Sequence, residues 1–189
     1  GRVIWTSGAT EAINLAISGL AHQYRHCGKH IISTVTEHKA TLETLKTLEN
    51  KGFSITLVPV DHRGMVSLDV LNNAIKDDTI LISIMHVHNE IGCIQAIDSI
   101  AKLCYEKGIM CHLDCAQTIG KTSMKLPKHI TAASFSAHKC YGPQGVGALY
   151  LSDNPKRKLQ PIIVGGGQQS HLRSGTIPLF LIAGFIKAI

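Results

Sequence analysis

The chain has 189 residues, of which 44% are hydrophobic and 17% are charged, and its formal net charge is +6. This size and balance suit one globular domain with a core and exclude a disordered chain. No apolar run reaches the roughly 18 residues that a membrane-spanning helix needs, so the sequence predicts no membrane span.

The positive charge is spread along the chain, and its densest cluster, Lys156-Arg157-Lys158, is short. A basic balance can indicate nucleic acid or an acidic ligand, but scattered lysines and arginines favour a solvated surface. We therefore expect no direct binding of nucleic acid or of a membrane. The six cysteines form no CxxC pair and no regular framework, so we expect reduced thiols and a cytoplasmic location.

Short apolar runs alternate with helical periodicity along the chain. This pattern predicts helices over residues 38–51, from Ser67 through Ile75, and over 99–107. Strands that alternate with crossover helices indicate an α/β fold with a mostly parallel central sheet and helices on both faces. The predicted strands are residues 2–5, 31–35, 53–60, 79–86, 109–113, 132–136 and 146–151.

Polar clusters follow three of these strands, at residues 86–90, 114–117 and 136–139. Ligands of such sheets bind outside the carboxyl ends of the strands, so the three clusters are expected to belong to one site.

Lys139 follows a strand of small residues and precedes a turn rich in glycine and proline. Such a position can partly desolvate a lysine, which favours the neutral amine that a Schiff base needs. The alternative is a surface lysine in a turn, and the surrounding motif argues against it.

Asp114 stands at the end of another strand, three residues before Gln117. An acid there can pair with the pyridinium nitrogen of a cofactor, and Gln117 can donate to its ring hydroxyl. The alternative is an aspartate that caps the next turn. Cys111, His112 and Cys115 lack a usual zinc spacing, and neighbours on a strand point to opposite faces, so we expect no metal.

Residues 6–14 combine a strand end, a small-residue turn and a helix start. Backbone amides at a helix N-terminus can bind an anion, and Thr10 adds a hydroxyl. The alternative is an ordinary helix cap, which would have the same sequence pattern. His38, in the first turn of the next helix, can stack on an aromatic ring and exchange protons. A capping or core histidine is its simpler interpretation.

His86 and His88 share a strand face, but no third metal ligand has a suitable spacing. Asn89 can donate to a cofactor hydroxyl. The glycine triplet 165–167 is followed by Arg173 and Thr176, which predicts either a flexible loop that meets a phosphate or partner subunit, or a linker.

Taken together, these motifs resemble those of the class V aminotransferase group of fold type I PLP-dependent enzymes. They look most like cysteine desulfurases of the iron–sulfur-cluster and nitrogen-fixation type. The matching segments stand in family order and cover nearly the whole chain: TSGATEAINLAI, TEHKA, ILISIMHVHNEIG, HLDCAQTIGK, SFSAHKCYGPQGVGALY and GGG…LRSGT. The resemblance implies that residues 1–189 are the PLP-binding large domain of such an enzyme, incomplete because the N-terminal segment and the C-terminal small domain are absent.

The resemblance also implies a role for each motif. Lys139 would hold pyridoxal 5'-phosphate (PLP) as a Schiff base, Asp114 would pair with the pyridine nitrogen, and Gln117 would reach the ring oxygen. His38 would stack on the ring and act as acid and base, while Asn89 would support the ring or the substrate. The phosphate would be held by Ala9, Thr10, Ser136 and His138, and by Thr176 of the neighbouring subunit in a homodimer.

Two departures from the family pattern are visible. The family usually has Gln-Glu-Arg-Gly after the glycine triplet, whereas this chain has residues 168–171 as QQSH, which removes a charge pair and a glycine. The persulfide cysteine and the substrate-carboxylate arginine of the family lie downstream of Ile189. None of the six cysteines matches the nucleophile, including Cys140 beside Lys139.

The implied reaction converts L-cysteine to L-alanine and passes sulfur, as a persulfide, to an acceptor such as an iron–sulfur scaffold or a tRNA- or cofactor-thiolation partner. Selenocysteine lyase or another class V aminotransferase-type enzyme would share Lys139 and Asp114. The alternatives from other classes are a catalytically silent PLP-fold binding subunit and, from charge alone, a nucleic-acid-binding module.

Overall fold

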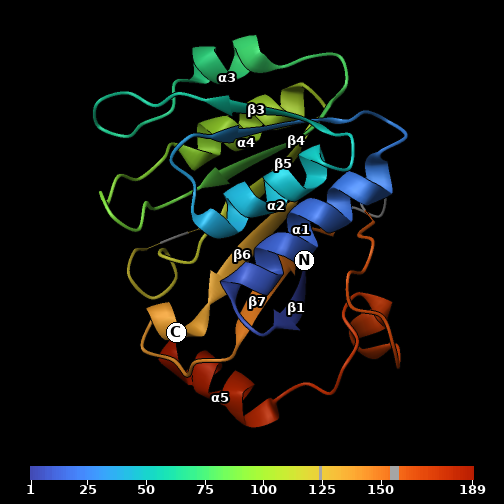
Figure 1. Ribbon diagram of the computed structural model, residues 1–189. Helices are drawn as coiled ribbons and strands as arrows, with labels where there is room; N and C mark the ends of the chain where they lie inside the picture. The colour runs from blue at the N-terminus through green and yellow to red at the C-terminus, as the bar shows by residue number, and fades with distance from the viewer. Residues whose placement is uncertain (124, 154–157) are drawn as a thin grey trace.

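The computed structural model describes residues 1–123, 125–153 and 158–189, so two residues of the basic cluster, Lys156 and Arg157, lie outside the described residues. Within these ranges, seven strands form one sheet in the order β1-β7-β6-β5-β4-β2-β3 (Figure 1). The strands are β1 (Arg2–Thr6), β2 (His30–Thr34), β3 (Ser54–Val58), β4 (Thr79–Met85), β5 (Met110–Asp114), β6 (Ala132–Ser136) and β7 (Gly147–Leu151). The helices are α1 (Ala9–Tyr24), α2 (Lys39–Glu49), α3 (Leu68–Ala74), α4 (Ile97–Glu106) and α5 (Leu179–Ala188), with short 3-10 turns η1 (Ala137–Lys139) and η2 (Gln168–His171).

The strand directions confirm a mostly parallel sheet. Strands β3, β2, β4, β5 and β6 are parallel to one another. Among the described strands, β7 alone runs antiparallel, between β6 and β1. The carboxyl ends of the parallel strands therefore meet at one edge, where polar side chains from separate motifs can converge.

Helices cover both faces of the sheet, as predicted. Because successive side chains of a strand point to opposite faces, Leu81 and Ile82 belong to different core clusters. Leu81 packs in the cluster that holds the buried residues of α1 and α2. Ile82 packs in the cluster that holds the apolar faces of α4 and α5.

On the face covered by α1, the side chains of the central strands change from apolar to polar toward the site. Three layers follow one another along the strands: Ile31, Leu81 and Met110, with Ala132 in the same core cluster; then Ser33, Ser83 and His112, whose ring reaches Ser134; then Met85 and Asp114, with Ser136 at the end of β6.

The middle layer, here called the polar ladder (Ser33, Ser83, His112 and Ser134), is buried and hydrogen-bonded. His112 Nδ1 lies 2.9 Å from Ser83 Oγ, and His112 Nε2 lies 2.8 Å from Ser134 Oγ. Ser33 Oγ donates to Ser83 O at 2.7 Å. Burial lowers the pKa of His112 to about 3, so the ring is neutral and joins two strands without bringing a charge into the core.

The segment for which the sequence predicts a flexible loop or a linker makes hydrogen bonds and an ion pair with the rest of the domain. The side-chain amide of Gln169 accepts from Trp5 N at 2.6 Å and donates to Trp5 O at 2.9 Å. Because β1 is an edge strand, Gln169 pairs with it as a residue of a further strand would. Arg173 Nε also lies 2.7 Å from Glu11 Oε1 of α1.

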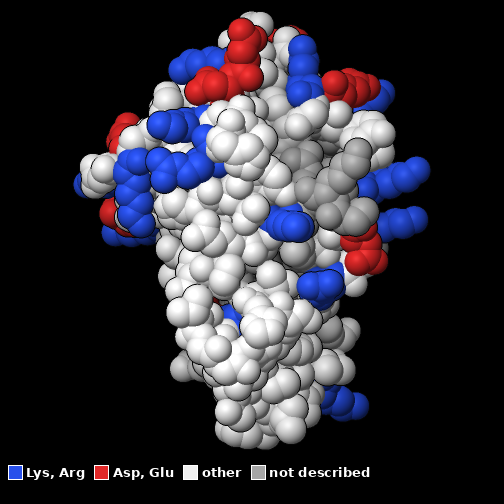
Figure 2. Space-filling model, turned by 90° about the vertical axis from the view of Figure 1, so that its right-hand side faces the viewer, with Lys and Arg blue, Asp and Glu red and all other residues white. Residues whose placement is uncertain are grey.

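Other surface features bear on the possible ligands. Within the described residues, no helix combines the length and apolar character needed to cross a bilayer, and no group of three or more His, Cys, Asp or Glu is arranged to hold a metal. All six cysteines, which lie in the described ranges, are free thiols. Both basic and acidic side chains lie on the upper part of the face in Figure 2.

Candidate cofactor site

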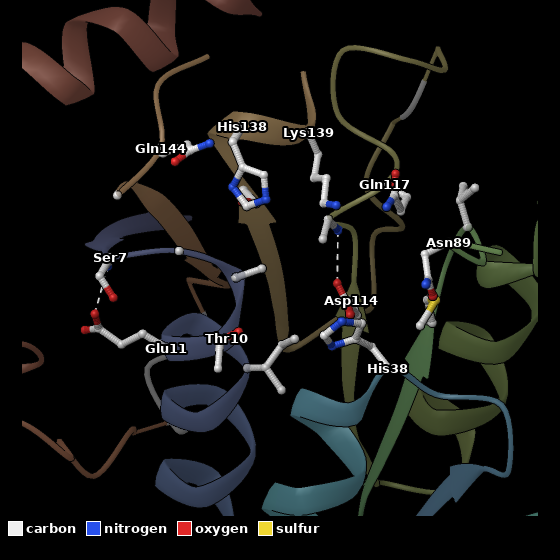
Figure 3. A pocket seen from close by; sticks show the side chains of 18 residues that line it. Ser7, Thr10, Glu11, His38, Asn89, Asp114, Gln117, His138, Lys139 and Gln144 are labelled. Atoms are coloured by element: carbon white, nitrogen blue, oxygen red, sulfur yellow. Dashed lines mark hydrogen bonds between the residues drawn. The ribbon is translucent and has the colours of Figure 1, made fainter. Parts of the chain in front are cut away.

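A cavity of about 500 Å³ opens at the carboxyl ends of β4, β5 and β6, beside the first turns of α1 and α2 (Figure 3). Thr176 is not among the residues that line this cavity in the single chain. The other predicted site residues all line it: Ala9, Thr10, His38, Asn89, Asp114, Gln117, Ser136, His138 and Lys139.

Asp114 is the last residue of β5, and its carboxylate forms the floor of the cavity (Figure 3). Its side chain is buried, and Oδ1 accepts a hydrogen bond from Ala116 N at 3.0 Å. Burial raises the pKa of Asp114 above its ordinary value, and the Ala116 amide and the nearby His38 partly offset this. A cationic partner in the cavity would stabilise the ionised carboxylate further.

His38 is the N-cap of α2, which confirms the capping interpretation, and the residue also lines the cavity. Its Nδ1 accepts from Ala40 N at 3.0 Å. A neutral ring that accepts at Nδ1 carries its proton on Nε2, so Nε2 is the atom that can donate to a ligand. Figure 3 shows the ring beside the Asp114 carboxylate, on the wall of the cavity.

Lys139 ends the 3-10 turn η1, and its amine points into the cavity between His138 and Gln117 (Figure 3). The expected desolvation is wrong for this chain, because the Lys139 side chain is exposed at the open rim. Gln117 Oε1 accepts from Lys121 Nζ at 2.6 Å. This contact leaves the Gln117 NH₂ group to donate into the cavity.

The turn before α1 supplies backbone donors. The N-cap residue Gly8 provides no side-chain cap, and the first intrahelical hydrogen bond is from Ala12 N to Gly8 O at 3.1 Å. The amides of Ala9, Thr10 and Glu11 therefore precede the hydrogen-bonded ladder at the positive end of the helix, as an anion site requires.

At the end of β6, Ser136 Oγ lies 2.9 Å from His138 Nδ1. Both side chains line the cavity together with the turn before α1, so side-chain and backbone polar groups are present at this part of the cavity.

Glu11 and Glu37 belong to two of the sequence motifs, but the sequence alone predicts no role for either residue. Glu11 lines the cavity, accepts from Ser7 N at 2.8 Å and pairs with Arg173. It thus joins the turn before α1 to the loop after the glycine triplet. The spacing of Ser7 and Glu11 is compatible with this contact, but only the fold brings Arg173 to it.

The mostly parallel sheet, with a polar cavity at the carboxyl ends of its strands, is an α/β arrangement that matches the PLP fold type I of NifS-like proteins. The aminotransferase class-V family model matches residues 1–189, and the chain belongs to this family.

The comparisons are more specific than the family. A cysteine desulfurase IscS from Pasteurella multocida is 49% identical over 187 residues, which cover 98% of this chain and 46% of that protein. A solved NifS-like protein superposes with a TM-score of 0.94 at 42% identity, over 99% of this chain and 52% of that one. DndA from Streptomyces lividans gives a TM-score of 0.93 at 39% identity, over 99% of this chain and 54% of that one. The chain spans about half the length of the curated relatives it matches.

Proposed function

We propose that this chain belongs to a PLP-dependent cysteine desulfurase, in which it forms the incomplete large domain that holds the cofactor. The observation that carries the proposal is the convergence of Lys139, Asp114, His38 and Gln117 on one cavity, opposite the uncapped start of α1. The relatives named as cysteine desulfurases support the choice of reaction.

The residues present fit PLP by their chemistry. The uncapped helix start offers amide donors for a phosphate. The buried carboxylate of Asp114 suits a protonated ring nitrogen, and the Gln117 NH₂ group suits a ring oxygen. Lys139 offers an amine at the rim. Asn89, Ser136 and His138 add polar groups around the ring and phosphate positions, and Thr176 would act across a dimer.

When bound, PLP supplies an electron sink for charge that develops on the substrate. Asp114 then holds a proton at the ring nitrogen, and Lys139 Nζ moves the proton at the substrate Cα. His38 donates from Nε2 or accepts there, because Nδ1 is committed to Ala40 N.

The overall reaction transfers one sulfur atom from L-cysteine to an enzyme thiol. The Cβ–S bond of L-cysteine breaks, and an S–S bond to the enzyme thiol forms. The loss of one proton from the enzyme thiol is balanced by the one hydrogen gained at Cβ, which becomes the methyl group of L-alanine. Cys140 does not suit this thiol, because it is buried and its Sγ donates to Ala137 O at 3.2 Å. A persulfide cysteine elsewhere in the intact protein would pass the sulfur to an acceptor protein or an iron–sulfur scaffold.

Exposed apolar side chains support a larger assembly, with a homodimer as the proposed form. Tyr141 is 96% exposed beside the site, and Leu179 and Phe180 of α5 are 69% and 77% exposed. An exposed apolar surface of this kind usually packs against another domain or subunit. Free thiols suit the reducing cytoplasm, where we place the enzyme.

The cofactor part of the proposal is tested on the intact protein by borohydride reduction, digestion and mass spectrometry. We expect a pyridoxyl adduct on the peptide that contains Lys139 and none in Lys139→Ala. Lys128→Ala, which changes an exposed lysine outside the cavity, serves as the matched control and should keep the adduct. An adduct on a different lysine would refute the role given to Lys139.

The reaction is tested by incubating the intact protein with L-cysteine and a thiol reductant. Alanine and sulfide should appear in equal amounts. A protein that binds PLP but forms no alanine from L-cysteine would refute the desulfurase assignment and leave the cofactor site standing.

A further inference from the structure

We infer that Glu37 is a positioning residue of the cofactor site: its carboxyl group anchors the segment that carries His38 to the carboxyl end of β4. The inference rests on the proposed function for the identity of the ligand. The anchor itself rests on contacts within the chain.

Strands β2 and β4 stop pairing shortly before the cavity. Their paired residues end at Ile32 and Ile82, whereas β4 remains paired with β5 up to Met85 and Asp114. Beyond that point, side chains of the β2 side meet the backbone of β4. Glu37 Oε1 accepts a hydrogen bond from Met85 N at 3.0 Å. The Glu37 carboxyl group therefore provides the hydrogen-bond partner of β4 at a point where the backbone of β2 is no longer paired with it.

The same oxygen holds the end of β2. Thr34 Oγ1 donates to Glu37 Oε1 at 2.9 Å, so one carboxyl oxygen joins the last residues of both strands. A second contact comes from the loop after β4, where His88 Nε2 lies 2.9 Å from Thr36 O. The segment that leads to His38 is thus fixed to the β4 side at two adjacent residues.

The protonation state of Glu37 is consistent with its position as a buried hydrogen-bond acceptor. The side chain is 6% exposed, and Oε2 is buried without a hydrogen-bond partner among the described residues. Burial raises the pKa of Glu37 to about 8, although Met85 N and Thr34 Oγ1 act in the opposite direction. At neutral pH the group is therefore mainly an uncharged acid, and Oε1 can accept both hydrogen bonds as its carbonyl oxygen.

An uncharged acid that acts through Oε1 has a near-isosteric substitute. Glutamine keeps one carbonyl oxygen that accepts from both donors, whereas leucine keeps the approximate volume and removes the acceptor. Loss of the acceptor leaves the Met85 amide buried and unpaired. One peptide bond separates Glu37 from His38, so a shift of this segment would move the His38 ring relative to Asp114.

The test compares Glu37→Gln, Glu37→Leu and the control Glu49→Leu, an exposed glutamate at the end of α2, in the intact protein. Two quantities are measured: the dissociation constant of PLP with the absorption spectrum of the bound cofactor, and hydrogen exchange of the peptide that contains Met85 without PLP. We expect Glu37→Leu to weaken PLP binding about tenfold, to shift the spectrum and to speed exchange, because one buried hydrogen bond is worth about that factor. Glu37→Gln should restore all three properties, and Glu49→Leu should leave them unchanged.

Equal exchange at Met85 in Glu37→Leu and wild type would overturn the anchor. Normal PLP affinity and spectrum in Glu37→Leu, despite faster exchange, would overturn its role in positioning the site. If Glu37→Leu does not fold, Glu37→Asp replaces it, because a carboxyl group shortened by one methylene cannot keep both contacts; unchanged exchange and affinity in Glu37→Asp would also overturn the inference. If the wild type binds no PLP, the proposed function fails, and hydrogen exchange alone still decides whether Glu37 is the anchor.

Discussion

Replacing His112 by Phe should destabilise the protein because it removes the hydrogen bonds of the polar ladder. The ring of His112 is fully buried and contacts Ser83 Oγ and Ser134 Oγ at 2.9 and 2.8 Å. Phenylalanine keeps an aromatic ring, which is larger than imidazole, but offers no nitrogen. Both serine hydroxyls then remain buried without their partner.

The magnitude follows from the two orphaned hydroxyls. Each buried polar group left without a hydrogen bond costs about 1–3 kcal/mol, so the free energy of unfolding should fall by about 2–6 kcal/mol. Removing the hydroxyls as well, in the triple variant Ser83→Ala, His112→Phe and Ser134→Ala, should recover much of this loss, because an apolar layer contains no unpaired group.

The ladder also predicts a dependence on pH. The pKa of His112 is lowered from 6.5 to about 3 in the folded state. Between these pH values the unfolded wild-type chain binds one proton more at this residue than the folded chain. The difference in free energy of unfolding between the wild type and His112→Phe therefore falls by about 1.4 kcal/mol per pH unit as the pH decreases. The contribution is fully present above the unfolded pKa and is lost as the pH falls through the folded pKa.

Urea unfolding followed by circular dichroism measures both effects, at about pH 7 and about pH 5. Other acids titrate in this range, so the relevant quantity is the difference between the wild type and His112→Phe, which should shrink at the lower pH. The reasoning is refuted if the triple variant is no more stable than His112→Phe, or if the difference between the wild type and His112→Phe is the same at both values.

Three further changes test other parts of the fold. Asp114→Asn should weaken PLP binding about 10- to 100-fold, as measured by absorbance titration, because a charged hydrogen-bond partner is lost; unchanged affinity would remove Asp114 from the site. Gly147→Ala should lower the thermal midpoint strongly, because the added Cβ would lie 2.5 Å from Gly8 C and 2.6 Å from Phe135 O; a normal midpoint would contradict this packing. His171→Gly should raise the thermal midpoint and stabilise the protein by up to about 1 kcal/mol, because His171 has a φ of 64°; a lower midpoint would mean that the side chain contributes more than the strain costs.

The fold class and the place of the site could be predicted because both depend on local patterns. Apolar runs such as residues 79–85 mark strands, and Asp114 stands at the end of one of them. Parallel strands bring such ends together whatever the details of the loops. The sequence pattern predicts that α2 starts at His38, which is its N-cap, and the glycine at position 52, with a φ of 85°, follows the end of the same helix.

Contacts between distant segments could not be predicted in this way. Gln169 lies 164 residues from Trp5, and neither residue carries a periodic signal that names the other. The anchor at Glu37 depends on the point where β2 and β4 separate, which is a property of the sheet. The exposure of Lys139 also follows from the open rim of the cavity, whereas the sequence shows only small residues around it.

The succession of apolar, polar and site layers along the central strands has a consequence for how this domain can diversify. The distance of a residue from the carboxyl end of its strand decides whether a substitution there changes the cavity or the packing of the core. Changes at Met85, Asp114 or Ser136 alter the chemistry of the cavity, while changes in the first layer alter only the fit of the core. The polar ladder lies between them and separates the two. New ligand preferences could therefore arise at the strand ends while the scaffold beneath stays the same, and an engineer could vary the outer layer alone.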